Sequence, residues 1–177
     1  YKGVRPVMWS PVEKTALADA EIEYKEHKSI TVWVRFPVAT PAFDSLEGAN
    51  IVIWTTTPWT LPSNRAVAYG AQIEYGLYEV LRVDDNNSRA RVGEKLVIAT
   101  DCAESVRQQA GIADLRLLET FQGTDMAGSI CHHPLHGYAD NGGYDYNVPL
   151  LEAGFVDTEQ GTGLVHIAPG HGTDDFY

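Results

Sequence analysis

The chain has 177 residues, 44% hydrophobic and 21% charged, enough for one domain with a real core. It lacks the run of about 18–20 apolar residues that a membrane span needs, and its first residues are not a signal peptide. Its two cysteines are too few for a disulfide framework, and this low number favours a reducing compartment. Its formal net charge of −11 argues against tight nucleic-acid binding, because phosphate neutralisation needs Lys and Arg, so any RNA contact must be local or made by other parts of a larger protein.

Short strands with few helices are predicted, because 16 Gly and 9 Pro separate short apolar runs. Residues 4–9 and 21–26 are predicted to be extended, with a turn at 10–13 that opens a short helical segment. Further along the chain, the patterns predict strands over 29–38, 50–54, 74–84, 95–99, 114–122 and 164–168, a helix over 101–110 with Gly111 as its C-cap, a turn at 84–88, and loops over 39–50 and 138–147.

Four threonines, Thr55, Thr56, Thr57 and Thr60, follow the apolar run 50–54 directly. Pro58 after Thr57 is typical of a capped helix start, which places these hydroxyls at the end of a strand. Hydroxyls donate and accept, so they can hold a water or a small polar substrate without adding charge. The alternative, a capped strand end without a functional role, stays open on this pattern alone.

A second cluster runs from Gly161 to Asp175 and combines two histidines and two carboxylates with several glycines. Glycine allows a backbone to approach a ligand closely, and a carboxylate at a helix start can pair with a ligand ammonium. Asp174 and Asp175 can equally be an acidic first turn that complements the helix dipole. His166 can be a satisfied core histidine, and His171 is expected to be exposed.

The segment from Cys131 to His136 invites a metal interpretation, with Cys131, His133 and His136 as the ligands of a metal hydrolase. Zinc sites, however, use spaced pairs of ligands, and no second pair lies nearby. The adjacent His132 and His133 would also point to opposite faces of a strand. No metal or other cofactor is therefore expected.

Over essentially its whole length, the sequence resembles the editing domain inserted in isoleucyl-tRNA synthetases of the bacterial type, members of class I. The resemblance rests on the segment Trp54 to Asn64 (WTTTPWTLPSN) and on Gly161 to Asp175, and the segments 6–11 and 15–21 support it. Valyl and leucyl editing domains carry Arg after the first two threonines and an acidic residue after Pro, whereas this chain has Thr57 and Trp59.

The resemblance implies an α/β fold with a compact β-barrel-like core and short peripheral helices. It implies one editing domain over residues 1–177, a fragment of a larger synthetase, with 1–28 and 172–177 flanking or leading into the catalytic body. The HIGH-like and KMSKS-like signatures of amino-acid activation are missing, so hydrolysis alone is expected. The expected location is the cytoplasm, or the mitochondrial matrix for an organellar enzyme.

The implied activity is deacylation of valine from the 3′ end of mischarged tRNA(Ile), with valyl-adenylate as a possible second substrate. Asp175 would bind the substrate ammonium, and Thr55, Thr56, Thr57 and Asn64 would order a water or the terminal ribose. Trp59 and Thr60 would shape the side-chain pocket, with Ala168 and His171 also contacting substrate, and His166 would exclude the extra methyl of isoleucine.

The expected partners are the charged tRNA end and the remainder of the synthetase polypeptide, with no membrane, and the isolated domain is expected to be a monomer. Three alternatives stay open: a valyl or leucyl editing domain, a non-catalytic RNA- or protein-binding β-barrel, and the metal hydrolase described above.

Overall fold

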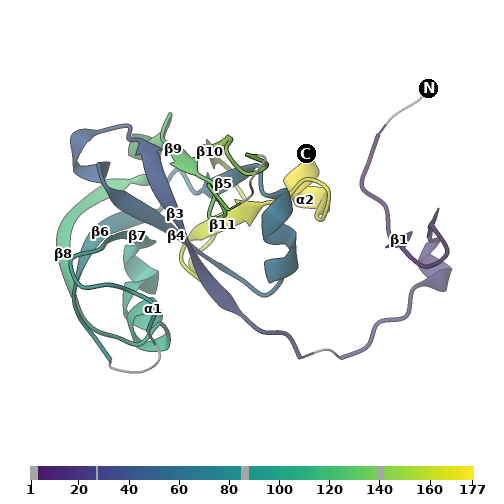
Figure 1. Cartoon of the computed structure of the whole chain (residues 1–177), viewed down its shortest axis with the longest axis horizontal. Coiled ribbons are helices and arrows are strands. Elements are labelled where there is room, and N and C mark those ends of the chain that lie inside the picture. The colour runs from purple at the N-terminus through teal and green to yellow at the C-terminus, as the bar shows by residue number, and fades with distance from the viewer. Residues whose placement is uncertain (1–3, 27, 85–87, 139–141) are drawn as a thin grey trace.

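The computed structural model describes residues 4–26, 28–84, 88–138 and 142–177. Its main feature is a nine-stranded mixed sheet in the order β11-β5-β10-β9-β3-β4-β7-β6-β8, accompanied by a few short helices (Figure 1). The expected α/β architecture is confirmed. No ladder among the described residues joins the end strands β8 and β11, so the sheet does not close into a barrel.

The strands are β1 (Trp9–Ser10), β2 (Thr15–Ala16), β3 (Val32–Thr40), β4 (Ala49–Thr55), β5 (Ala66–Tyr69), β6 (Glu74–Val83), β7 (Lys95–Ala99), β8 (Ile112–Gln122), β9 (Ile130–His132), β10 (Asn147–Glu152) and β11 (Leu164–Ile167). The helices are α1 (Ala103–Gln109) and α2 (Thr173–Phe176), and the 3₁₀ turns are η1 (Asp19–Glu21), η2 (Asp44–Leu46), η3 (Pro58–Ser63), η4 (Thr100–Cys102) and η5 (Gly123–Met126).

The hydrophobic core lies along the central strands β4, β7 and β6. Ile51 and Ile53 of β4 are fully buried, as are Val97 and Ile98 of β7. These β-branched side chains favour extended backbone and fill the interior of the sheet. The core therefore holds the end of β4 in place, and the threonine cluster begins there.

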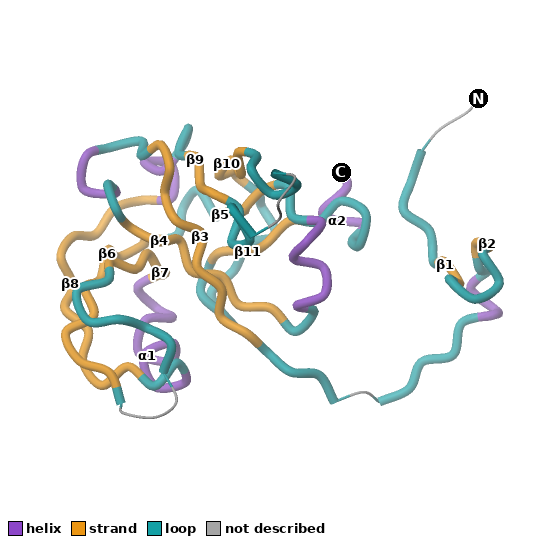
Figure 2. Tube along the Cα trace, viewed as in Figure 1, coloured by secondary structure: helices purple, strands orange, loops and turns teal. Residues whose placement is uncertain are grey.

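Pairing of β5 with β11 brings distant parts of the chain together. β5 follows η3 directly, and in its antiparallel ladder with β11 Val67 lies opposite His166. The buried Tyr75 hydroxyl also donates to the carbonyl of Gly163, 2.6 Å away, and thereby fixes the start of β11. As a result, η3, β11 and α2 lie side by side (Figures 1 and 2).

Several predicted elements need correction. Strands β5, β9 and β10 were not predicted: all four residues of β5 are buried, which hides alternation, and β9 has only three residues. The loop predicted over 39–50 gives way at its ends to β3 and β4 and contains η2. Part of the turn predicted at 84–88 and part of the loop at 138–147 lie outside the described residues, and Asn147 begins β10.

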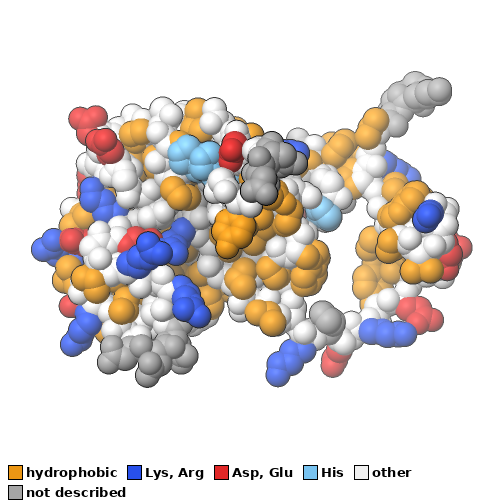
Figure 3. Space-filling model, viewed as in Figure 1, with side chains coloured by type: hydrophobic (Ala, Val, Ile, Leu, Met, Phe, Trp, Pro, Cys, Tyr) orange, Lys and Arg blue, Asp and Glu red, His pale blue; other side chains and the backbone are white. Residues whose placement is uncertain are grey.

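The turn predicted at 10–13 is confirmed, but the helical segment expected to begin there is not, and the first helical turn in the part of the chain that the structure describes is η1. Residues 11–14 form the turn of a hairpin in which Trp9 of β1 lies opposite Ala16 of β2. This hairpin stands apart from the sheet, and its hydrophobic side chains are visible on the surface (Figures 1 and 3). Trp9 is 56% exposed and Val12 is 86% exposed. Among the described residues, no helix combines the length and apolar character needed to cross a membrane.

Candidate active site

A pocket of about 240 Å³ forms where β4 and η3 face β11 and α2. The two sequence clusters, about a hundred residues apart, supply its walls. The residues that line it are Trp54, Thr55, Thr57, Thr60, Val165, His166, Ala168, His171, Gly172 and Asp175. The pocket is thus lined by hydroxyls, two imidazoles and a single carboxylate.

The threonines form a small hydrogen-bonded turn at the end of β4. Thr55 Oγ1 accepts from the backbone N–H of Thr57 at 3.0 Å and lies 3.1 Å from Thr57 Oγ1. Thr57 occupies the cap position of η3 and Pro58 its first position, as predicted, but no side-chain cap bond forms. The Thr57 hydroxyl therefore turns toward Thr55 and the pocket instead of closing the helix end.

His166 is held on both sides of its ring. Its Nε2 lies 2.8 Å from Thr60 Oγ1, and its Nδ1 lies 2.8 Å from the Asn64 amide nitrogen. That amide nitrogen also donates to the carbonyl of Ala66, so it is the nitrogen and not the oxygen of the amide that faces the ring. Nδ1 is consequently an acceptor, and Nε2 carries the hydrogen in the neutral ring.

Thr60 is consistent with a hydrogen on Nε2 of His166. Its hydroxyl donates to the carbonyl of Thr57 at 2.8 Å and is therefore free to accept from Nε2–H of His166. Burial lowers the pKa of His166 below 6.5, His133 and His171 lower it further, and Asp175 opposes this shift. The imidazole is thus neutral at neutral pH and rigidly placed, because rotating it would break both contacts.

Asp175 lies in α2 and reaches back to β11. Its Oδ2 accepts from the backbone N–H of Ala168 at 2.7 Å. Within the described ranges no group bonds the other oxygen, Oδ1, which leaves it available to a ligand. A Cβ added to Gly172 would lie 3.1 Å from the carboxyl carbon, so glycine at this position gives the carboxylate its room.

Seven of the ten residues singled out in the sequence line this pocket. The other three are Thr56, Trp59 and Asn64. Trp59 is 61% exposed, and Thr56 is exposed with its carbonyl accepting from Ser29, whereas Asn64 is buried behind His166. Trp54, Val165 and Gly172 line the pocket but were not singled out, although their direct neighbours in the sequence were, and that proximity was the available signal.

The Cys131–His136 segment is built differently from a metal centre. Cys131 is buried in β9, which raises the pKa of its thiol to about 12. Both ring nitrogens of His133 are engaged, Nε2 with the Leu61 carbonyl and Nδ1 with the Leu135 N–H, and His136 pairs with Asp145. The part of the chain that the structure describes contains no group of three or more potential metal ligands.

Comparison with solved structures identifies the fold. The editing domain of cytosolic leucyl-tRNA synthetase from P. knowlesi matches with a TM-score of 0.59 and 12% identity, covering 84% of this chain and 62% of that one. The P. falciparum counterpart matches with a TM-score of 0.55 and 15% identity, covering 72% of this chain and 44% of that one. The chain therefore has the fold of aminoacyl-tRNA synthetase editing domains.

Comparison with curated proteins finds sequence relatives that are isoleucine--tRNA ligases. Isoleucine--tRNA ligase of Gluconobacter oxydans is 52% identical over 99% of this chain, and that of Bradyrhizobium diazoefficiens is 47% identical over the same share. The chain matches one segment of these isoleucine--tRNA ligases and spans 18% and 17% of the length of the two relatives. No family model matches it.

Proposed function

We propose that this pocket hydrolyses the ester of valine mischarged to tRNA(Ile), and also accepts valyl-adenylate. The proposal rests on one observation above all: a neutral, rigidly held His166 and a carboxylate with a free oxygen face the same small pocket. A hydrophobic pocket distinguishes one methylene by only about 1–3 kcal/mol, a magnitude established on this very class of enzymes. A second, hydrolytic site adds the discrimination between valine and isoleucine that the first pocket cannot supply.

Asp175 is the proposed anchor for the substrate ammonium. The backbone N–H of Ala168 fixes Oδ2, so the carboxylate presents Oδ1 to the pocket in one orientation. A charge-assisted contact there positions the ester for attack. The neutral state of His166 supports the same role, because a charged imidazole in this pocket would repel the ammonium.

His166 is the proposed limit on side-chain size. Thr60 and Asn64 hold its ring at both nitrogens, so the ring cannot swing aside when a larger side chain enters. Isoleucine would meet this wall with its additional methyl, whereas valine would fit in front of it. Val165, Ala168 and His171, which line the same pocket, complete the proposed binding surface.

Thr55 and Thr57 are the proposed ligands for the attacking water or the terminal ribose. Their hydroxyl oxygens lie 3.1 Å apart, and Thr55 Oγ1 already accepts one hydrogen bond, from the backbone N–H of Thr57. Both hydroxyls therefore retain capacity to bind a further oxygen. Thr56 and Trp59, which point outward, would contact the tRNA end and not the amino acid.

The remainder of the synthetase is the proposed source of most tRNA affinity. The chain carries a net charge of −11, so phosphate binding over a large surface is unfavourable. In this account, residues 1–177 form one editing unit of a cytoplasmic or organellar enzyme, and residues 1–28 and 172–177 connect it to the catalytic body. The exposed apolar side chains of the β1–β2 hairpin support docking on that body.

The function is tested by a deacylation panel with this chain and with the full-length enzyme that contains it. Valyl-, isoleucyl-, threonyl- and leucyl-tRNAs are offered separately, and hydrolysis of each ester is followed over time. The account expects preferential loss of valine from tRNA(Ile), and expects His166→Ala to begin hydrolysing isoleucyl-tRNA(Ile). A full-length enzyme that spares valyl-tRNA(Ile) would favour the non-catalytic RNA-binding alternative.

A further inference from the structure

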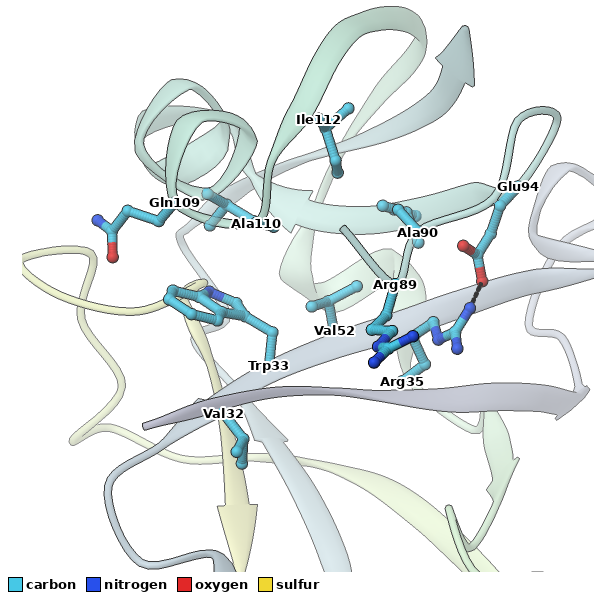
Figure 4. Close-up of a pocket in the computed structure, with 12 residues that line it drawn as sticks. Val32, Trp33, Arg35, Val52, Arg89, Ala90, Glu94, Gln109, Ala110 and Ile112 are labelled. Carbon is cyan, nitrogen blue, oxygen red and sulfur yellow. Dashed lines mark hydrogen bonds and ion pairs between the residues drawn. The ribbon is translucent and has the colours of Figure 1, made fainter. Parts of the chain in front are cut away.

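A second pocket, of about 320 Å³, lies beyond the editing pocket and shares no lining residue with it. Strands β3 and β4 form its floor, and the C-terminal end of α1 and the segment before β7 cover it (Figure 4). Small-molecule sites in proteins start at about 300 Å³, so the space suits one compact ligand. The editing reaction proposed above makes no use of it.

The pocket has an aromatic end with an unused donor. Trp33 lines it, and the indole Nε1–H is buried without a hydrogen-bond partner among the described residues. A buried donor without an acceptor is costly, and native proteins rarely tolerate one. Val52 adds apolar surface beside the ring, and Ile112 lines the pocket farther from it (Figure 4). A flat heteroaromatic ring with acceptor atoms complements this end.

The other end is cationic. Arg35 and Arg89 both line the pocket, on the opposite side of Val52 from the Trp33 ring (Figure 4). Arg35 Nη1 is paired with Glu94 Oε1 at 2.5 Å, and the Glu94 side chain is only 10% exposed. Glu94 also accepts from the backbone N–H of Arg91, so its carboxylate is fully engaged.

Arg89 is left as a surplus positive charge. Nothing in residues 4–26, 28–84, 88–138 or 142–177 pairs with its guanidinium, so this end carries two cations and one carboxylate in a chain of net charge −11. On the face shown in Figure 3, Lys and Arg side chains also gather over the part of the body that carries β6, β8 and α1. A guanidinium binds phosphate oxygens well.

We propose that this second pocket binds a nucleotide. The edge of the base accepts from Nε1–H in the plane of the Trp33 ring, and the phosphate pairs with Arg89. Arg35 is a positioning residue. Glu94 fixes its side chain, which lines the phosphate end of the pocket and adds to the positive potential there. A free mononucleotide and a single unpaired nucleotide of an RNA share this chemistry.

The test is titration of the 177-residue chain with adenosine 5′-monophosphate, followed through the indole N–H resonances of its four tryptophans. Trp33→Phe assigns the Trp33 signal and removes the donor. The proposal expects saturable binding that shifts the Trp33 indole signal, and weaker binding of adenosine, which has no phosphate. A chain that shows no saturable shift of Trp33 at millimolar nucleotide would overturn it.

Arg89→Met and Arg91→Met form a matched pair, because both residues are exposed in the same segment and only Arg89 lines the pocket. Arg89→Met is expected to weaken nucleotide binding about tenfold, the effect of losing one charge-assisted hydrogen bond, and Arg91→Met to leave it nearly unchanged. Equal effects of the two variants would contradict the proposal.

A short single-stranded oligonucleotide distinguishes the two sources of the ligand. If it shifts the same resonance and binds more tightly than the mononucleotide, the occupant is a nucleotide of an RNA. The reverse order identifies a free mononucleotide. An oligonucleotide and a mononucleotide that both bind but shift only residues of the editing pocket would refute the second site while leaving the editing function intact.

Discussion

The Asn64 amide nitrogen lies 2.8 Å from Nδ1 of His166, and this contact decides which ring nitrogen carries the hydrogen. Asn64 comes at the end of η3 and His166 lies in β11, so the contact exists only because β5 and β11 pair. The amide gives the ring a neutral neighbour that donates to it. The side of the pocket that His166 forms is therefore uncharged.

Replacing that amide with a carboxylate should reverse the ring's hydrogen-bonding. In Asn64→Asp, Nδ1–H would donate to a negative oxygen, which favours the imidazolium, and the pKa of His166 should rise above 6.5. NMR titration of the His166 ring signal measures this pKa. Asn147→Asp, which adds the same charge at an exposed position in β10, serves as the control. A pKa that stays below 6.5 in Asn64→Asp would contradict the assigned hydrogen bonds.

The same burial predicts a pH dependence of folding stability. Burial lowers the pKa of both His166 and His133 below 6.5, so the folded protein binds fewer protons than the unfolded chain in that window. Stability should therefore fall as the pH drops from above 6.5 through the lowered values. Urea midpoints measured at about pH 7.5 and about pH 5.5 should differ, with the lower value in acid.

Variants separate this effect from other titrations. His166→Gln should reduce the difference between the two urea midpoints, whereas His171→Gln, which removes only the smallest contribution to the lowered pKa of His166, should change it much less. Glu104, whose pKa is lowered to about 2 by hydrogen bonds from Arg107 and Gln108, contributes only at lower pH, because its stabilisation is complete above 4.5. Midpoints that do not move between the two pH values would count against the neutral, buried histidines.

The space beside Gly172 predicts a remote effect on the active site. A Cβ at this position would lie 3.1–3.3 Å from the carboxyl atoms of Asp175 and would push the carboxylate away. The carboxylate would have to shift by a few tenths of an ångström, so Gly172→Ala should slow valyl-tRNA(Ile) deacylation in the full-length enzyme. Gly170→Ala adds a methyl to open space two residues earlier and should have little effect. Equal rates in the two variants would show that Asp175 does not need this room.

The sequence predicted the long strands and the helix before Gly111 well, because their signals are local. Gly111 has a φ of +65°, the left-handed conformation that a helix C-cap requires. Strand β5 was missed because its signal is not local: Ala66 to Tyr69 are all buried by neighbours from distant parts of the chain. Composition alone cannot distinguish such a strand from a turn.

The pocket, like the fold, was predicted only in part. The two clusters that supply it were recognisable as residues, but their hydrogen bonds were not. Asn64 illustrates the difference, since its side chain supports His166 from behind and does not line the pocket. Trp59 illustrates the opposite case, because a large apolar side chain in a motif is easily expected to face inward, yet 61% of it is exposed.

The central claim is that the carboxylate of Asp175 anchors the substrate ammonium, and a paired substitution tests it most directly. Asp175→Asn keeps the shape of the side chain and removes its charge, whereas Asp174→Asn makes the same change at the exposed neighbouring residue. The account predicts that valyl-tRNA(Ile) deacylation by the full-length enzyme falls by about a hundredfold or more in Asp175→Asn and hardly changes in Asp174→Asn. An undiminished rate in Asp175→Asn would contradict it.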